Sequence, residues 1–82
     1  MKLSLSRSAQ KDLDRLDDDT TLRVSAKLYT LGNNPYQRGF EKLSGNKGYR
    51  IRIGDYRVVY LIDKKSKEVT IIKVKHRREV YR

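Results

Sequence analysis

Three arginines alternate around a short turn, where they are placed to bind an anion. Arg50, Arg52 and Arg57 flank the dipeptide Gly54-Asp55, which lies between two runs of alternating residues. Glycine at the first central position fits a two-residue type II′ turn, because φ is positive there. The resulting β-hairpin sets Arg52 directly opposite Arg57, and like charges in that position are destabilising. We therefore interpret the arginine face as an anion site. The alternative is that the three stems merely cover the sheet with their charges in water.

The same turn predicts the register of the hairpin. Side chains alternate along a strand, so the face opposite the arginines is apolar. It consists of Tyr49, Ile51, Ile53, Tyr56, Val58 and Tyr60. The predicted cross-strand pairs are Ile53 with Tyr56, Arg52 with Arg57, Ile51 with Val58, and Arg50 with Val59. This apolar face is the expected core surface of the sheet.

A strand and two helices are expected before the hairpin. Residues 2–6 alternate and predict a strand with Leu3 and Leu5 facing inward, after which Ser6 or Ser8 can cap a helix. The apolar stripe of this helix is Ala9, Leu13 and Leu16. The acidic residues 17–19 end it and favour the start of a second helix, because they complement the helix dipole. We interpret this run as capping and predict no metal site.

The second helix is expected from about Thr20 to Leu31. Its inward stripe is assigned to Leu22, Ala26 and Tyr29, widened by Val24, Leu28 and Leu31. Gly32 is the expected C′ residue, and Pro35 prevents continuation. Residues 36–47 then form a polar loop, with Phe40 and Leu43 as anchors to the core.

A turn at residues 63–67 and a strand at residues 68–75 complete the expected sheet. If Ile62 pairs with Glu68, Arg57 faces Lys73, and Lys75 extends the same side. Thr70, Ile72 and Val74 then join the core face. A slip of one residue would reverse this assignment. The order β-α-α-β-β-β predicts a small α+β fold: a mainly antiparallel sheet with a helical hairpin on one face and a basic open face, in a single domain spanning 1–82.

The charge of the chain is positive and unevenly placed. The net charge is +10 over 82 residues, of which residues 1–31 carry +1 and residues 32–82 carry +9. This asymmetry favours nucleic acid as a partner. Solubility and a membrane surface are the alternatives, but basic residues dispersed through strands do not suit an amphipathic membrane helix. The chain has no cysteine, signal peptide or membrane-spanning run, so a cytoplasmic protein without a disulfide framework or thiolate metal site is expected.

The residues that could transfer a proton are few. Arginine stabilises negative charge on phosphate but is a poor base, because it is always protonated. Phosphodiester cleavage would need a proton acceptor such as His76, Glu41, Tyr81, or a group on the carrier of the substrate. Histidine is the residue type whose unperturbed pKa lies near neutrality, but His76 is equally interpreted as an ordinary histidine at a strand end. Tyr81 either packs as a terminal hydrophobic residue or stacks on an RNA base.

Two segments carry a resemblance to a known family. "KLSGNKGYRIRIGDYRVVYLID" at 42–63 and "KVKHRREVYR" at 73–82 resemble the RelE/ParE superfamily of toxins, and more closely its RelE branch. The resemblance implies a ribosome-dependent endoribonuclease that cuts mRNA in the A site by attack of a ribose 2′-OH, with no cofactor. The family's catalytic positions fall on Arg50, Arg52, Arg57, Arg77 and Tyr81. Lys47, Lys73, Lys75 and Arg78 are the expected additional RNA contacts.

The chain departs from the family in ways that leave alternatives open. Lysine stands in the best-known branch where this chain has Arg50 and Arg52, which weakens a role as base there. Other branches use a glutamate and a C-terminal histidine, and Glu41 and His76 match those parts. The chain end leaves no room for the C-terminal helix of some members. A ParE-like toxin acting on DNA gyrase and a non-catalytic nucleic-acid-binding module remain the alternative functions.

The resemblance also implies partners. These are a cognate antitoxin, the ribosomal A site and its mRNA, with no membrane involved. The toxin–antitoxin complex would bind its own operator DNA through the antitoxin.

Overall fold

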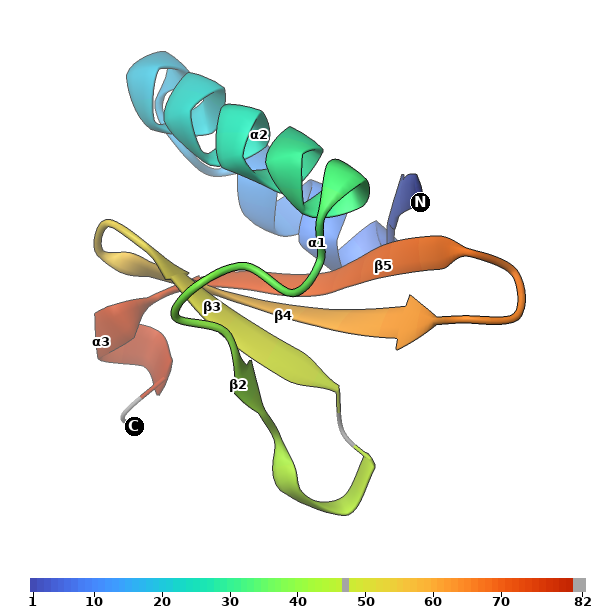
Figure 1. Cartoon of the computed structure of the whole chain (residues 1–82). Coiled ribbons are helices and arrows are strands. Elements are labelled where there is room, and N and C mark those ends of the chain that lie inside the picture. Colours follow the sequence, from blue (N-terminus) through green and yellow to red (C-terminus); the bar gives the residue numbers. More distant parts are fainter. Residues whose placement is uncertain (47, 81–82) are drawn as a thin grey trace.

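The computed structural model describes residues 1–46 and 48–80. It has two layers, in which helices pack on a sheet (Figure 1). The elements in chain order are β1 (Lys2–Leu5), α1 (Arg7–Asp14), α2 (Asp18–Asn33), β2 (Glu41–Lys42), the 3₁₀ turn η1 (Ser44–Asn46), β3 (Tyr49–Ile53), β4 (Tyr56–Asp63), β5 (Glu68–His76) and α3 (Arg77–Val80). Within the described residues the sheet has five strands in the order β1-β5-β4-β3-β2. Only the pairing of β1 with β5 is parallel there.

The helices lie on one side of this sheet. Figure 1 shows α1 and α2 over one face, while the single turn of α3 lies at one end of the other face. The α+β fold with a helical hairpin on one face is thereby confirmed. The prediction that residues 36–47 form only a loop is wrong in one respect. Glu41 and Lys42 pair with Arg50 and Tyr49 and form the edge strand β2. None of the helices among the described residues is long and apolar enough to cross a membrane.

The central hairpin of β3 and β4 has the predicted register. Ile53 pairs with Tyr56, Arg52 with Arg57, Ile51 with Val58, and Arg50 with Val59. Gly54 has φ 58°, which agrees with a turn that needs a positive φ at its first central residue. Ile51, Val58 and Tyr60 are buried, and Tyr49, Ile53 and Tyr56 pack against them. The apolar face of the hairpin therefore forms the floor of the core.

Helix α1 begins and packs as expected, but the strand before it does not. The Ser6 side chain accepts a hydrogen bond from the Ala9 N–H at 3.0 Å and caps the helix. Ala9 and Leu13 are buried, and Leu16 is half-buried just past the helix end. Leu5, expected to face inward, is 38% exposed because β1 is an edge strand of only four residues.

Helix α2 turns a different face to the sheet from the one expected. Val24, Leu28 and Leu31 are buried, whereas Leu22 and Tyr29 are 70% and 71% exposed and Ala26 is exposed as well. The assignment of the main stripe was therefore wrong. Both triplets have the same i, i+4, i+7 spacing, so periodicity alone does not choose between them. The acidic start was predicted correctly, since Asp17 caps the helix and Asp18 and Asp19 lie in its first turn.

Gly32 is not the C′ residue of α2 but lies inside the helix. A Cβ at this position would lie 3.2 Å from the Leu3 Cβ, which is tighter than ordinary contact. The glycine lets α2 approach β1 closely. The helix ends at the cap Asn34, which has the extended conformation that the following Pro35 favours.

The register of β4 with β5 also differs from the expectation. Asp63 pairs with Glu68, so the connecting turn has four residues, and the register shifts between Val59 and Tyr60. Arg57 consequently lies opposite Lys75 and not opposite Lys73. The core residues of β5 are Val69, Ile71 and Val74. Thr70 and Ile72, which were expected in the core, are only half-buried.

Candidate nucleic-acid interface

Three arginines from three elements line one hollow at the end of the sheet. Arg52 comes from β3, Arg57 from β4 and Arg77 from the start of α3, and together with Asp55 and Tyr56 they enclose about 190 Å³. The Arg77 N–H donates to the Asp55 carbonyl oxygen at 2.7 Å. This bond ties α3 to the hairpin turn and brings Arg77 to the other two arginines.

The side chain of Arg52 is held by the turn itself. Its Nε donates to the Gly54 carbonyl oxygen at 3.1 Å. Guanidinium groups are planar and present several donors, so one bond to the backbone leaves the fork available for an anion. The cross-strand pair Arg52 and Arg57, predicted from the sequence, therefore contributes two of the residues that line this hollow. We call it the arginine hollow; its lining residues are Arg52, Asp55, Tyr56, Arg57 and Arg77.

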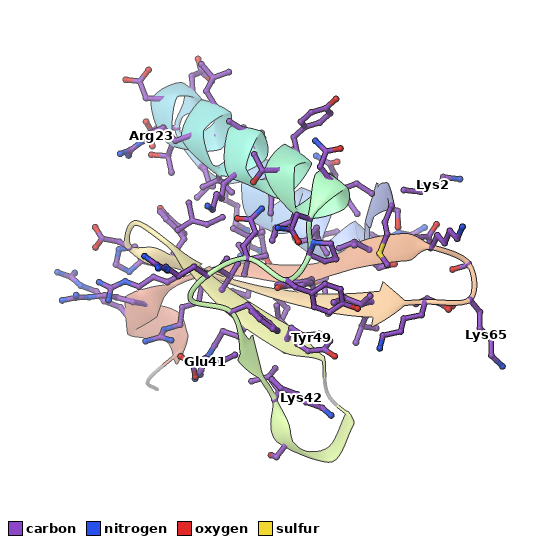
Figure 2. The ribbon with its side chains drawn as sticks, in the orientation of Figure 1. Lys2, Arg23, Glu41, Lys42, Tyr49 and Lys65 are labelled. Carbon is purple, nitrogen blue, oxygen red and sulfur yellow. The ribbon has the colours of Figure 1, made fainter. Side chains whose placement is uncertain are left out.

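Arg50 lies next to the arginine hollow but binds a carboxylate of the protein. Its Nη2 is 2.6 Å from Glu41 Oε2, across the β2–β3 pair. Figure 2 shows Glu41 on the side of the sheet that α1 and α2 leave open. The Arg50 Nε atom is buried and has no hydrogen-bond acceptor among the described residues. An unsatisfied buried donor is costly, which favours a further acceptor at this point of the surface.

The pairing with Arg50 changes the acidity of Glu41. The hydrogen bond from Arg50 lowers the pKa of the Glu41 carboxyl, and the charges of Arg50 and Arg57 lower it further. A carboxylate with a lowered pKa is a weaker proton acceptor. The geometry therefore makes Glu41 a partner of the arginines more than a strong base.

His76 is separated from the arginines by the ring of Tyr56. The two residues are cross-strand partners, and their rings meet edge to face with centroids 5.2 Å apart. His76 lines a different hollow of about 170 Å³, which Asp12, Arg15, Leu16, Tyr56 and Val74 also line. Its Nδ1 accepts a hydrogen bond from the Arg78 N–H at 3.2 Å.

The lysines predicted to contact RNA lie at the edge of the same face. Lys73 is exposed on β5, and Lys75 lies opposite Arg57 with its Nζ 2.8 Å from Asp12 Oδ1. Arg78 is exposed in α3. Lys47 and Tyr81, for which RNA contact and base stacking were predicted, lie outside the described residues.

Sequence reasoning missed three residues of this region. Asp55 was assigned only to the turn, and Tyr56 only to the core, yet both line the arginine hollow. Asp12 lies in α1, is 6% exposed and forms an ion pair with Lys75 of β5. The signal for Asp12 was available, because a carboxylate between Ala9 and Leu13 on the inward side of a helix must have a partner.

The chemistry of the site is that of concentrated positive charge. Among residues 1–46 and 48–80, no group of three or more histidine, cysteine, aspartate or glutamate residues is arranged to hold a metal ion. The guanidinium groups of Arg52, Arg57 and Arg77 can each donate to phosphate oxygens, with geometry that suits two parallel bonds. The arrangement is therefore suited to a phosphodiester.

Comparison with known proteins identifies the family. The model of the ParE toxin of type II toxin–antitoxin systems matches residues 3–81. The chain belongs to this toxin family, which is part of the RelE/ParE superfamily. No curated protein sequence gives a significant match.

Solved structures of RelE toxins share the fold. The RelBE2 toxin–antitoxin complex of Mycobacterium tuberculosis contains a chain with 26% identity and a TM-score of 0.82, over 92% of this chain and 95% of that one. The archaeal RelE–RelB complex of Pyrococcus horikoshii gives 30% identity and a TM-score of 0.80, over 93% of each chain. The isolated RelE toxin of E. coli gives 27% identity and a TM-score of 0.77, over 98% of this chain and 89% of that one.

Proposed function

We propose that the protein is a RelE-type mRNA interferase, a ribosome-dependent endoribonuclease that cuts mRNA in the A site and inhibits translation in the cytoplasm. The observation that carries the proposal is the arginine hollow, where Arg52, Arg57 and Arg77 converge from three elements. The similarity to RelE structures at 26% to 30% identity supports it.

The proposed reaction is an internal transesterification of RNA. The ribose 2′-oxygen attacks the adjacent phosphorus, the bond from phosphorus to the 5′-oxygen breaks, and a 2′,3′-cyclic phosphate and a 5′-hydroxyl remain. A base takes the 2′-OH proton, and an acid protonates the leaving 5′-oxygen. Negative charge builds up on the non-bridging oxygens during attack. Fixed guanidinium groups stabilise that charge more than the charge of the starting phosphodiester, which lowers the barrier.

The proton acceptor is the least developed part of the site. Arg50 lowers the pKa of Glu41, and His76 lies behind Tyr56 from the arginines. The protein then contributes mainly electrostatic stabilisation, and the ribosome orients the RNA and completes the proton transfer. Because the ribosome would supply the orientation and the proton transfer, cleavage would require the ribosome. Glu41 and His76 remain the proposed contributors to proton transfer from this chain, and Tyr81 is the proposed stacking residue.

A cognate antitoxin is the proposed regulatory partner. The relatives from M. tuberculosis and P. horikoshii were solved as toxin–antitoxin complexes. The net charge of +10 favours an acidic antitoxin segment lying across the basic face and the helices, where it would cover Arg57 and Arg77. The complex would bind operator DNA through the antitoxin.

A ParE-like inhibitor of DNA gyrase is the second candidate. The observation in its favour is that the matching family model is that of the ParE toxin. This function would use the shared fold and require no cleavage of RNA, so the two candidates differ in a measurable product.

Primer extension on a defined mRNA in a purified translation system separates the candidates. We expect cleavage within an A-site codon only when ribosomes are present. Arg57→Ala should reduce the rate by about 100-fold or more, because loss of one charge-stabilising donor costs that much in comparable sites. Tyr81→Phe keeps the aromatic ring and removes only the hydroxyl, so it tests that hydroxyl in proton transfer and not the stacking. Lys65→Ala, which removes an exposed charge in the turn between β4 and β5, is the matched control.

The other outcomes each point elsewhere. Intact mRNA at toxin concentrations that stop growth would refute the ribonuclease activity. Inhibition of DNA gyrase would then be tested by a supercoiling assay. Binding of RNA without cleavage, unchanged by Tyr81→Phe, would indicate a non-catalytic nucleic-acid-binding module. Arg57→Ala should leave the melting temperature nearly unchanged, since Arg57 lies on the open face, and a large loss would contradict its assignment to the site.

A further inference from the structure

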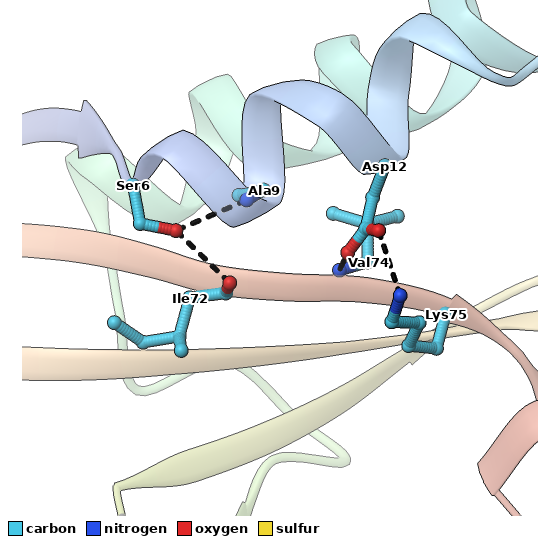
Figure 3. A network of polar contacts seen from close by, with 6 residues as sticks. All are labelled: Ser6, Ala9, Asp12, Ile72, Val74 and Lys75. Atoms are coloured by element: carbon cyan, nitrogen blue, oxygen red, sulfur yellow. Dashed lines mark hydrogen bonds and ion pairs between the residues drawn. The ribbon is translucent and has the colours of Figure 1, made fainter.

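Asp12 is a carboxylate on the buried side of α1. It is 6% exposed and lies beside Ala9 and Leu13 of the core. Its Oδ2 accepts a hydrogen bond from the Val74 N–H at 3.0 Å, and its Oδ1 accepts one from Lys75 Nζ at 2.8 Å (Figure 3). Burial of a charge is unfavourable unless it is paired and hydrogen-bonded, and both conditions are met here.

One carboxylate oxygen of Asp12, Oδ2, bonds to the backbone at the edge of the sheet. Strand β1 pairs with β5 only as far as Ile71. Past that point α1 and its cap supply the partners of β5: Ser6 Oγ donates to the Ile72 carbonyl oxygen at 3.0 Å, and Asp12 accepts from Val74 (Figure 3). Side chains of one helix thus replace the missing strand, and Asp12 fixes the backbone of β5 at its second half.

This contact follows directly after the irregularity in β5. The register with β4 shifts between Val59 and Tyr60, and the buried positions of β5 change from Val69 and Ile71 before the shift to Val74 after it. A single extra residue moves the following side chains to opposite faces. The shift is therefore what sets Lys75 opposite Arg57, and the bond from Val74 to Asp12 holds the strand in that phase.

We infer that Asp12 is a positioning residue of the proposed RNA-binding face, where it holds Lys75 beside Arg57 as a further phosphate-binding cation. The inference rests on the proposed function, because its ligand is the phosphate backbone of RNA. Lys75 retains 31% side-chain exposure while paired with Asp12, whose side chain is 5% exposed. An ammonium group carries three donors, so contact with a carboxylate is compatible with contact to a phosphate.

The positioning role and simple electrostatics predict opposite effects on RNA binding when the charge of Asp12 is removed. Asp12→Asn deletes a negative charge close to the basic face, which by Coulomb attraction would strengthen the binding of RNA. The asparagine oxygen still accepts from the Val74 N–H, but the ion pair between residue 12 and Lys75 is lost. If Asp12 positions Lys75, binding must weaken although the protein has become more positive. The sign of the change therefore separates positioning from simple electrostatics.

The test uses the full chain and a single-stranded RNA with 2′-O-methyl groups, which cannot react. Its dissociation constant is measured by fluorescence anisotropy over a range of NaCl concentrations. We expect Asp12→Asn and Lys75→Gln each to weaken binding by about 3- to 10-fold and to reduce the salt slope by about 0.7, the value for one phosphate contact on a single strand. The double variant should bind no more weakly than Lys75→Gln. Asp14→Asn, an exposed carboxylate of the same helix bound by Gln10, is the matched control and should not weaken binding.

Three outcomes would overturn the inference. These are unchanged or tighter binding by Asp12→Asn, additive losses in the double variant, and an unchanged salt slope for Lys75→Gln. The Lys75→Gln result keeps the test decisive even if Asp12→Asn does not fold, and melting curves set a temperature at which the compared variants are native. Arg57→Ala separates this inference from the proposed function. If Arg57→Ala binds as the wild type does, or if the wild type does not bind, binding of free RNA by this face is refuted and the inference falls with it, while primer extension on ribosomes still decides the proposed function separately. If Arg57→Ala binds more weakly and only the Asp12 and Lys75 predictions fail, the inference alone is lost.

Discussion

At the scale of single residues, Tyr60 links the hairpin to the loop that follows α2. Its side chain is fully buried, and its hydroxyl donates to the Pro35 carbonyl oxygen at 2.8 Å. Its ring stacks on Tyr49, with centroids 5.8 Å apart. Burial raises the pKa of Tyr60 to about 12, with smaller contributions from Tyr49 and Tyr36. The neutral phenol is therefore part of the folded structure.

The raised pKa of Tyr60 predicts a loss of stability at alkaline pH. Between pH 10 and 12 the unfolded chain releases the Tyr60 proton while the folded chain keeps it, so the free energy of unfolding falls as the pH rises through this range. The loss is about 2–3 kcal/mol, since one pKa unit corresponds to about 1.4 kcal/mol. Urea unfolding of the wild type and of Tyr60→Phe at several pH values measures it.

The Tyr60→Phe variant is the control for the other groups that titrate in this pH range, because it keeps all of them. Tyr60→Phe should be less stable at pH 8, because the Pro35 carbonyl loses its donor, but the difference from the wild type should shrink toward pH 12. A constant difference across that range would contradict the assignment of the alkaline loss to Tyr60.

At the scale of elements, the start of β3 depends on a glycine that the next strand approaches closely. Gly48 has φ +101°, and a Cβ there would lie 2.5 Å from the Tyr60 carbonyl oxygen. Gly54 in the hairpin turn has φ +58° but nothing within 4 Å of a Cβ. The two glycines therefore differ in the reason why they are needed: backbone strain alone at Gly54, and strain together with a backbone clash at Gly48.

We expect Gly48→Ala to cost more stability than Gly54→Ala. Strain of a non-glycine residue in the left-handed region costs about 1–2 kcal/mol, which is the whole cost at Gly54. The clash with backbone adds to this at Gly48, for a total above about 2 kcal/mol. Urea denaturation of both variants tests the order. Equal losses would show that β3 moves away from β4 to admit the methyl group.

At the scale of the whole molecule, the excess of positive charge lies in the second part of the chain, in its strands, turns and end, and not in α1 or α2. Residues 32–82 carry a net charge of +9, whereas the basic and acidic residues of α1 balance, as do those of α2. Arg52, Arg57 and Arg77 meet near the tip of the hairpin. Mutual repulsion of these charges destabilises the free protein, and an anionic partner relieves it. The charges proposed to bind the substrate thus also favour stabilisation of the toxin by its partners.

An anion that fits the arginine hollow should stabilise the fold more than ionic strength alone. We expect phosphate to raise the melting temperature above that in chloride of the same ionic strength. At ten times its dissociation constant, the ligand adds about 1.4 kcal/mol, or roughly 8 °C for a domain of this size. In Arg57→Ala most of this difference should disappear, whereas Lys65→Ala should keep it. Equal melting temperatures in the two salts would argue against a specific anion site.

The central hairpin and the arginines that it carries follow from local signals in the sequence. Alternation and the Gly54-Asp55 turn involve neighbouring residues, and a two-residue turn leaves only one register. Arg52 and Arg57 could therefore be paired from the sequence, and the structure confirms the pair. The caps Ser6 and Asp17 were predictable for the same reason, because a capping bond spans only three residues.

The faces and registers that join these local elements depend on long-range packing, which the sequence pattern does not reveal. Helix α2 has two equally spaced apolar stripes, and the close approach of Gly32 to Leu3 accompanies the inward placement of Val24, Leu28 and Leu31. The shift in β5 depends on where β1 ends and α1 takes over its edge, which are contacts between residues about 60 positions apart, such as Asp12 and Val74. Periodicity is a property of neighbours along the chain. It cannot specify contacts that arise only when distant segments pack.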